Sequence, residues 1–259
     1  MGRILAGALA TALMAVLLVP HATVIWLSLV DHRLWGPEIF PTALTLDNYL
    51  AVFRDPQVFA PVRNSLWMSG AAALGCLAIG APAAYLIARK RPGARWVNLL
   101  VMIPWALPGT VVAINLIAGF NDLPLSREAL VWMLPLAYFV RGIPLFTRMA
   151  SAAIEPFDAR LIEAGQSLGG SRMYCLRRVA LPLLAPAIAA GAALVFATSL
   201  GEFVASVLLY LPGNKPIAIQ INEWVRGSMI GTAYAYSVFL MALVAGTFVC
   251  ARRFSSRVI

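Results

Sequence analysis

The stretch LLAPAIAAGAALVFATSLGEFVASVLL, residues 183–209, decides the fold class of this chain, because it contains one charged residue, Glu202. A helix that crosses a bilayer needs roughly 20 predominantly apolar residues, and this run exceeds that length. Alanines repeat at every fourth position near its start, at Ala185, Ala189, Ala193 and Ala197. Small residues at this spacing allow helices to approach closely inside a membrane. The stretch therefore predicts a transmembrane helix packed against its neighbours.

Apolar composition extends over the whole chain of 259 residues. Hydrophobic residues make up 61% of it, charged residues make up 12%, and the mean hydropathy is +0.82. These values lie outside the range of soluble domains. Apolar runs of spanning length occur at 4–30, 65–88, 97–120, 129–147, 183–209 and 233–250. The chain is therefore predicted to be an all-α membrane protein with six transmembrane helices.

The runs also predict the organisation of the chain. The first run is longer than the roughly 7–15 apolar residues of a cleavable signal peptide, so we expect a permanent helix there. Residues 1–62 then form the first helix and an extracytoplasmic segment, 63–250 form a transmembrane core, and 251–259 form a basic tail. The third and fourth runs contain prolines that either create hinges or only kink the helices, namely Pro104, Pro108, Pro135 and Pro144, and we expect kinks alone.

Lys and Arg are distributed unevenly among the segments that connect the runs. Short loops rich in these residues stay in the cytoplasm. With a cytoplasmic N-terminus, 13 of the 20 Lys and Arg residues fall on the cytoplasmic side: Arg3, Arg89, Lys90, Arg91, Arg95, Arg148, Arg160, Arg172, Arg177, Arg178, Arg252, Arg253 and Arg257. Both termini are therefore predicted to lie in the cytoplasm, with the chain crossing the cytoplasmic (inner) membrane several times. The concentration of Lys and Arg on one membrane face, where anionic lipid attracts them, accounts for the net charge of +9, so no nucleic acid partner is needed to explain it.

The longest predicted cytoplasmic loop, 148–182, contains the polar stretch EAGQSLGGSRMYCLRRVALP at 163–182. Asp158 is expected to cap a short helix through Leu168, and Gly169 and Gly170 are expected to end it in the left-handed conformation. Ser171 is expected to cap a second helix.

The first of these short helices carries a narrow apolar stripe, formed by Leu161, Ala164, Gly165 and Leu168. Such a stripe suits docking into the groove of a partner protein. The residues alone support an alternative equally well, in which the segment lies on lipid headgroups with Arg172, Arg177 and Arg178 bound to anionic lipid.

The order of residues in the loop favours the docking interpretation. Glu163-Ala164, Gly169, Val179 and Leu181-Pro182 follow the pattern Glu-Ala-Ala, three variable residues, Gly, nine variable residues, Ile, one variable residue, Leu-Pro. The loop therefore resembles the EAA motif of binding-protein-dependent ABC transporter permeases, with Gly165 in place of the second Ala and Val179 in place of the Ile. Two further stretches, RNSLWMSG from Arg63 and IPWALPGTVVAINL from Ile103, resemble the start of the permease core and its Pro-interrupted third span.

The resemblance implies a type I ABC importer permease fold and a set of partners. Two ATPase subunits would dock from the cytoplasm, and a second permease, identical or similar, would share the substrate path. An extracytoplasmic solute-binding protein would deliver the substrate to the segment 31–61, which contains Asp31, His32, Glu38 and Asp47. ATP would be bound by the ATPase subunits, because this chain has no GxxxxGK[ST] sequence.

The resemblance also assigns roles within the loop. Glu163 is expected to be the charged contact to the ATPase, and Ala164 and Gly165 to permit close approach. Gly169 is expected to make the turn, and Pro182 to start the fifth span, where a missing amide donor does no harm.

Two charged residues, Arg141 and Glu202, lie inside predicted spans. Charge at membrane depth usually faces a partner or a polar cavity. At 1.5 Å per residue the two positions differ in depth by roughly 8 Å, which a long Arg side chain can cover. Two interpretations remain open and equal: Glu202 lies on the substrate path or at a subunit contact, or Arg141 and Glu202 form a pair that only fixes helix packing.

The substrate and the competing function classes are less constrained. The SLGG sequence after the EAA residues resembles the subgroup for ferric iron, thiamine, polyamines, phosphonates, sulfate and molybdate, and LGEFVASVLLYLPGNKPIAIQI, from Leu200, resembles its iron-type members most.

Half of a gradient-driven secondary transporter is the alternative function, although it would be expected to carry several intramembrane carboxylates. The sequence lacks the catalytic motifs expected of a membrane enzyme, since it contains no HExxH and no acidic pair in a span. Three isolated cysteines and two histidines predict no metal site, and no cofactor is expected in the chain.

Overall fold

Helices build nearly all of the protein in the computed structural model, which describes residues 2–31, 43–54, 56–121 and 130–258. Among these residues, the only pairing of extended backbone is an isolated antiparallel bridge between Val30 and Leu44. The helices are α1 (Gly2–Ser28), α2 (Asp47–Arg54), α3 (Pro56–Gly75), η2 (Cys76–Gly80), α4 (Ala81–Ala88), α5 (Ala94–Met102), η3 (Ile103–Ala106), α6 (Gly109–Phe120), α8 (Met133–Ile154), α9 (Arg160–Ser167), α10 (Arg172–Cys175), η4 (Leu176–Ala180), α11 (Leu181–Leu200), α12 (Ser206–Leu209), α13 (Ile217–Arg226) and α14 (Ile230–Val258). The predicted all-α class is confirmed. His32 and Glu38, predicted to face a binding protein, lie outside the described residues.

Membrane-spanning length is reached by several of these helices. In the described part of the chain four are long and apolar enough to cross a bilayer, Leu5–Ser28, Val58–Ala88, Arg172–Leu200 and Ile230–Arg253, and a bent pair formed by Ala94–Ala106 and Gly109–Phe120 could make a fifth. Helix α8 has 22 residues and covers most of the predicted fourth span, but it carries Arg141 and Arg148 and is less apolar. The membrane class is therefore confirmed, while the number of six crossings stays a prediction.

Two of the long helices contain a π-helical turn, η2 in the second predicted span and η4 before the fifth. Such turns widen the helix locally and often occur at functional positions. In the second span the turn ends at Gly80, where an added Cβ would lie 2.6 Å from Phe146 Cδ1 on α8. Gly80 therefore allows α8 to approach the second span closely.

The third predicted span, 97–120, is not one kinked helix, and the expectation of simple kinks there was wrong. The segments Ala94–Ala106 and Gly109–Phe120 meet at an angle of 108°. Leu107 is extended, with φ −98° and ψ 133°, because the ring of the following Pro108 disfavours helical backbone at the residue before it. Pro108 also lacks the amide hydrogen with which an uninterrupted helix would bond back, so the preceding helix cannot continue through it, and α6 begins at Gly109. We call residues 104–109 the elbow.

The fifth predicted span, 183–209, also differs from the structure, because its helix ends at Leu200 with Gly201 as the C-cap. Glu202 supplies the local reason for the new direction of the chain. Its carboxylate Oε1 accepts a hydrogen bond from the Ala205 amide at 3.0 Å, and its backbone carbonyl accepts one from Ser206 Oγ. These bonds compete with continuation of the helix and organise the start of the short helix α12.

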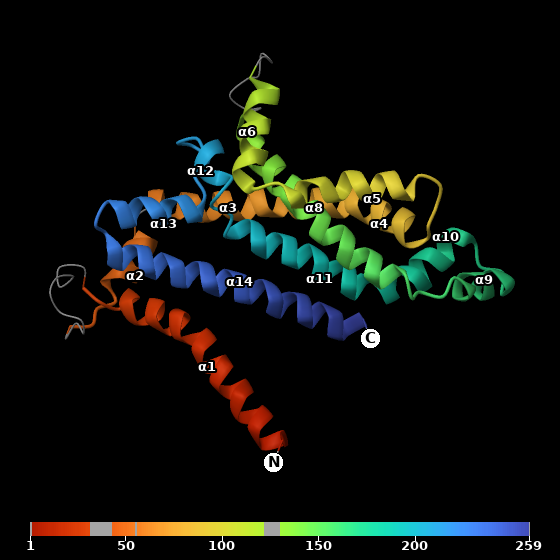
Figure 1. The fold of residues 1–259 in the computed structure, drawn as a ribbon, viewed down its shortest axis with the longest axis horizontal. Helices are drawn as coiled ribbons and strands as arrows, with labels where there is room; N and C mark the ends of the chain where they lie inside the picture. The colour runs from red at the N-terminus through yellow and green to blue at the C-terminus, as the bar shows by residue number, and fades with distance from the viewer. Residues whose placement is uncertain (1, 32–42, 55, 122–129, 259) are drawn as a thin grey trace.

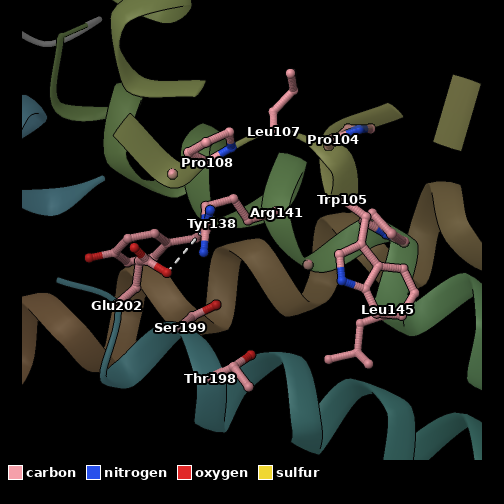
Figure 2. A pocket seen from close by; sticks show the side chains of 13 residues that line it. Pro104, Trp105, Leu107, Pro108, Tyr138, Arg141, Leu145, Thr198, Ser199 and Glu202 are labelled. Carbon is pink, nitrogen blue, oxygen red and sulfur yellow. Dashed lines mark hydrogen bonds and ion pairs between the residues drawn. The ribbon is translucent and has the colours of Figure 1, made fainter. Parts of the chain in front are cut away.

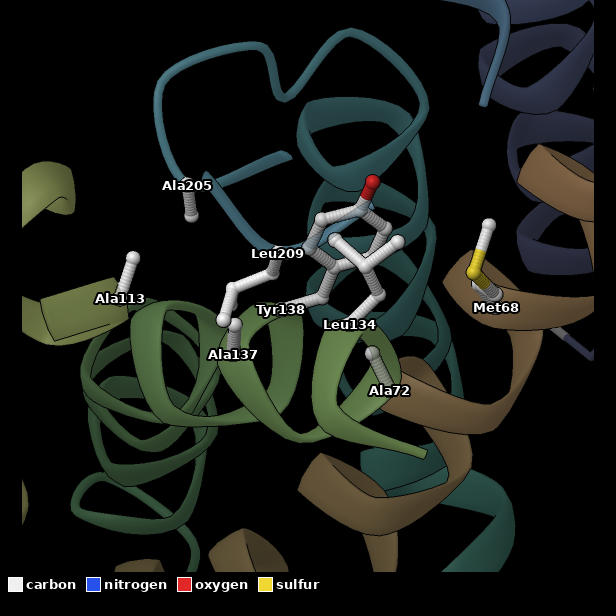
Figure 3. Packing of buried hydrophobic residues seen from close by; sticks show 8 residues of the cluster. All are labelled: Met68, Ala72, Ala113, Leu134, Ala137, Tyr138, Ala205 and Leu209. Atoms are coloured by element: carbon white, nitrogen blue, oxygen red, sulfur yellow. The ribbon is translucent and has the colours of Figure 1, made fainter. Parts of the chain in front are cut away.

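Helix α8 lies at the centre of the bundle, against α3, α4 and α11, whereas α1 diverges from the other helices toward the N-terminus and α6 projects from them (Figure 1). Figure 3 shows one of the cores that α8 supports, with Leu134, Ala137 and Tyr138 of α8 surrounded by Met68, Ala72, Ala113, Ala205 and Leu209. On another face of α8, an added Cβ at Gly142 would lie 2.7 Å from Val195 Cγ1 of α11. Close contacts of this kind hold helices together inside a membrane.

Candidate functional site

The polar stretch forms a helical hairpin at one end of the molecule. Helix α9 starts at Arg160, after Ala159 at the N-cap, and Asp158 Oδ1 accepts a hydrogen bond from the Arg160 amide at 2.9 Å. Asp158 therefore supports the helix start one residue before the N-cap, rather than as the N-cap itself. The turn after α4, with Arg89, Lys90 and Arg91, and the start of α5, with Arg95, lie at the same end as α9 and α10, while α2 and α13 lie at the other end (Figure 1).

Helix α9 ends in a Schellman motif, which satisfies the free carbonyls of its last turn. The Gly170 amide donates to the Gly165 carbonyl at 3.0 Å, and the Gly169 amide donates to the Gln166 carbonyl at 2.9 Å. Gly169 has φ +88°, a conformation that favours glycine, whereas Gly170 does not adopt a positive φ. Of the two predicted left-handed glycines, only Gly169 is left-handed.

Ser171 begins the second helix as predicted, because its Oγ accepts a hydrogen bond from the Tyr174 amide at 3.2 Å. From there α10, η4 and α11 form one continuous helix, Arg172–Leu200, of 29 residues. Pro182 is therefore the second residue of α11 but not at a free helix start, because η4 runs into α11 without a break; where the fifth span enters the membrane stays a prediction. The π turn η4 comes directly before it and ends with the Leu181 amide donating to the Leu176 carbonyl, a wider spacing that accommodates the proline ring.

The two faces of α9 are different. Glu163, Ala164, Leu161 and Leu168 are exposed, and Leu168 is 90% exposed. Gly165 instead packs inward, since an added Cβ there would lie 2.7 Å from the Sγ of the buried Cys175. The predicted apolar stripe is thus divided: Gly165 attaches α9 to α10, and the other three residues remain available to a partner.

The remaining residues of the motif follow on the helix that leads into α11. Val179 and Pro182 are half-buried, and Leu181 is exposed. Between them Ala180 is buried. This segment therefore connects the exposed hairpin to the packed part of the bundle.

A second candidate site lies at the far end of α11, where Arg141 and Glu202 form an ion pair (Figure 2). Arg141 Nε donates to Glu202 Oε2 at 3.0 Å, and the two side chains are 31% and 14% exposed. Tyr138 and Ser206 extend this polar group, with a hydroxyl-to-hydroxyl distance of 2.7 Å. The pair is therefore held by α8 on one side and by the chain after the α11 break on the other.

The ion pair borders a cavity of about 330 Å³ between the elbow, α8 and α11 (Figure 2). Its lining combines apolar, aromatic and polar residues: Pro104, Trp105, Leu107, Pro108, Gly109, Tyr138, Arg141, Gly142, Pro144, Leu145, Thr198, Ser199 and Glu202. At Gly109 an added Cβ would lie 2.7 Å from Arg141 Nη1, so the guanidinium lies directly against the start of α6. Arg141 thus contacts the start of α6 at the elbow and, through Glu202, the chain after the end of α11.

Sequence reasoning missed Gly109, Tyr138, Cys175 and Ser206 as neighbours of the predicted residues. The Leu107-Pro108-Gly109 sequence was the available signal for the elbow, because a proline followed by a glycine marks a turn more often than a kink. Nothing in the sequence placed Cys175 beneath Gly165. Within the described residues, His, Cys, Asp and Glu form no group of three or more that could hold a metal ion.

Comparison with known proteins decides the family. Residues 77–259 match the family model described as "Binding-protein-dependent transport system inner membrane component". The chain belongs to this family. The predicted family is therefore confirmed, and the chain is an inner-membrane component of the permease type.

Individual relatives agree with this assignment. A probable ABC transporter permease from Sinorhizobium fredii is 31% identical over 264 residues, which cover 98% of this chain and 46% of that protein. This chain thus spans about half the length of that relative. A putative 2-aminoethylphosphonate transport system permease from Salmonella typhi is 28% identical over 245 residues, covering 93% of this chain and 91% of the relative.

Among solved structures, the permease matches one chain of a bacterial alginate ABC transporter in complex with an alginate-bound periplasmic protein. The TM-score is 0.75 with 18% identity, over 98% of this chain and 94% of the other. At this identity the match shows the fold, which is that of an ABC importer permease.

Proposed function

We propose that this chain is the permease subunit of an ATP-driven ABC importer, with α9 as the element that couples it to ATPase subunits. The observation that carries the proposal is the construction of α9: Glu163, Ala164 and Leu168 are exposed on a short helix that is locked onto a 29-residue helix. A partner that holds the exposed face of α9 can move the fifth span as a lever.

The partners follow from this function. Two ATPase subunits bind and hydrolyse ATP at the α9 end, which faces the cytoplasm, where Lys and Arg are concentrated. A second permease, identical or similar to this chain, completes the substrate path, and an extracytoplasmic solute-binding protein delivers the substrate at the α2 and α13 end.

The cavity beside Arg141 and Glu202 forms part of the substrate path. Helices that are interrupted at membrane depth leave polar groups facing a cavity, and transporters use such breaks at their binding sites. Its volume of about 330 Å³ suits a small polar solute, such as the ferric iron, thiamine, polyamine or phosphonate substrates of the resembling subgroup. Among these substrates, the name of the Salmonella relative, a putative 2-aminoethylphosphonate transport system permease, supports a phosphonate.

The test is a pull-down of the tagged chain from native membranes in mild detergent, with the co-purified proteins identified by mass spectrometry and their ATP hydrolysis measured. We expect an ATPase subunit to be recovered with the natural chain and lost with Glu163→Lys. Glu155→Lys is the control, because it makes the same charge change at an exposed residue outside α9. A chain that purifies without any ATPase, and whose uptake does not need ATP, would contradict the proposal and favour a gradient-driven carrier.

A further inference from the structure

Arg89 connects the end of the second span to the segment that precedes α9. Its Nη2 donates a hydrogen bond to the Phe157 backbone carbonyl at 2.7 Å, across 68 residues of sequence. The guanidinium carbon also lies 5.8 Å from the centroid of the Phe157 ring. The two contacts use different properties of the same side chain, namely its N–H donors and its flat cationic surface.

The position of Arg89 is fixed by the way α4 ends. Arg89 is the C-cap residue of α4, and the next residue, Lys90, has φ +48°. The Arg91 amide donates to the Leu86 carbonyl and the Lys90 amide to the Ile87 carbonyl, which completes a Schellman motif with a lysine in the position that usually holds glycine. A left-handed lysine is uncommon and persists where the surroundings require it. The turn therefore holds Arg89 in place rather than leaving it on a loose loop.

Phe157 lies in the short connection between α8 and α9. Its amide donates to the Ile154 carbonyl at 3.2 Å, and its side chain is half-buried. The two ends of α9 are thus held differently. The C-terminal end is held by the Schellman motif, the Ser171 cap and the Gly165 contact with Cys175. At the other end Asp158 supports the first turn locally, and the connection just before it, at Phe157, is held from another span by Arg89.

We propose that Arg89 is a positioning residue for coupling: it ties the second span to the start of α9, so that a displacement of α9 moves α4 together with α11. The proposal rests on the proposed role of α9. Arginine suits both contacts, because its guanidinium donates to the Phe157 carbonyl and covers the Phe157 ring at the same time. A lysine offers the charge and donors without the flat surface.

The experiment uses the complete transporter, purified with its ATPase and solute-binding partners and reconstituted in proteoliposomes. ATP hydrolysis is measured with and without the solute-binding protein, and the amount of ATPase subunit bound to the permease is quantified. For Arg89→Gln we expect ATPase binding and basal hydrolysis to stay close to those of the natural protein, and the stimulation by the binding protein to fall about tenfold. Arg89→Lys should fall in between, since it keeps the charge and loses the stacking.

The matched control is Arg95→Gln, which removes the same charge from an exposed residue of the same turn region. Stimulation in Arg89→Gln equal to that in Arg95→Gln would overturn the inference. If Arg89→Gln does not assemble, the test uses Arg89→Lys and Phe157→Leu instead. Phe157→Leu keeps the backbone carbonyl and removes only the ring. Stimulation of ATP hydrolysis at the wild-type level in both variants would overturn the inference. If the wild-type complex shows no stimulation of ATP hydrolysis by the solute-binding protein, the proposed function is overturned, and the inference with it.

Discussion

The hairpin of α9 and α10 and the cavity beside Arg141 and Glu202 stand at opposite ends of one helix and are built in opposite ways. The hairpin is stabilised by contacts between residues close in sequence, such as the bond from Gly170 to Gly165 and the Ser171 cap. The cavity is assembled from three distant segments, the elbow at 104–109, the middle of α8, and the end of α11. At 1.5 Å per residue, the helix Arg172–Leu200 separates them by roughly 43 Å.

The two kinds of construction tolerate movement differently. A local motif keeps its shape when distant parts of the protein move, which suits an element held by a partner. An assembled cavity changes shape whenever one of its three segments shifts, which suits a path that must open and close. The predictions below test whether the two regions differ in this way.

Loss of the Glu202 carboxylate has the largest expected effect. Glu202→Ala leaves the Arg141 guanidinium without its partner in the cavity, and we expect a loss of stability of about 3 kcal/mol. Arg141→Met combined with Glu202→Gln removes both charges and keeps an acceptor for the Ala205 amide. We therefore expect this double variant to show nearly natural thermal stability in detergent, measured as Tm.

The double variant also separates the two interpretations of the ion pair. If the pair lies on the substrate path, the stable double variant should fail to take up the solute carried by the co-purified binding protein. Uptake at the wild-type level by this variant would show that the pair only fixes helix packing, and the cavity would lose its proposed role.

An intermediate effect is expected at the contact between α9 and α10. Gly165→Ala brings a Cβ to 2.7 Å from Cys175 Sγ, and overpacking of this kind costs about 1–3 kcal/mol. We expect α9 to shift and the recovery of the ATPase subunit to fall. Cys175→Ala should restore recovery in the double variant, because the Cys175 Cβ would lie 3.6 Å away, an ordinary contact. If Gly165→Ala alone binds the ATPase normally, α9 does not depend on this contact.

The same contrast explains what the sequence could predict. The all-α class, the Ser171 cap and the left-handed Gly169 depend on composition and on residues a few positions apart, so their patterns were sufficient. The Arg89 contact with Phe157 and the lining of the cavity depend on which distant helices become neighbours, and the inward position of Gly165 depends on how α9 folds back onto α10. Patterns within one segment do not reveal either. The breaks at Pro108 and Gly201 lie between these cases, because their local signals were present but apolar runs of spanning length outweighed them.

The smallest expected effect sharpens the claim that the hairpin is locally determined. Gly169→Ala forces an alanine into φ +88°, where its Cβ is strained, and we expect a loss of about 1 kcal/mol although nothing lies within 4 Å of the added atom. Gly70→Ala is the matched control, since Gly70 lies inside α3 with equally open space, and there the change should stabilise the helix by up to about 1 kcal/mol. Thermal unfolding in detergent measures both, with hydrogen exchange of the Gly170 amide as the local readout. If backbone conformation makes the turn, the thermal unfolding temperature should fall in Gly169→Ala and rise in Gly70→Ala. Hydrogen exchange at the Gly170 amide should become faster only in Gly169→Ala. Equal shifts in both would mean that packing from distant segments holds the hairpin, and the distinction between the two regions would fail.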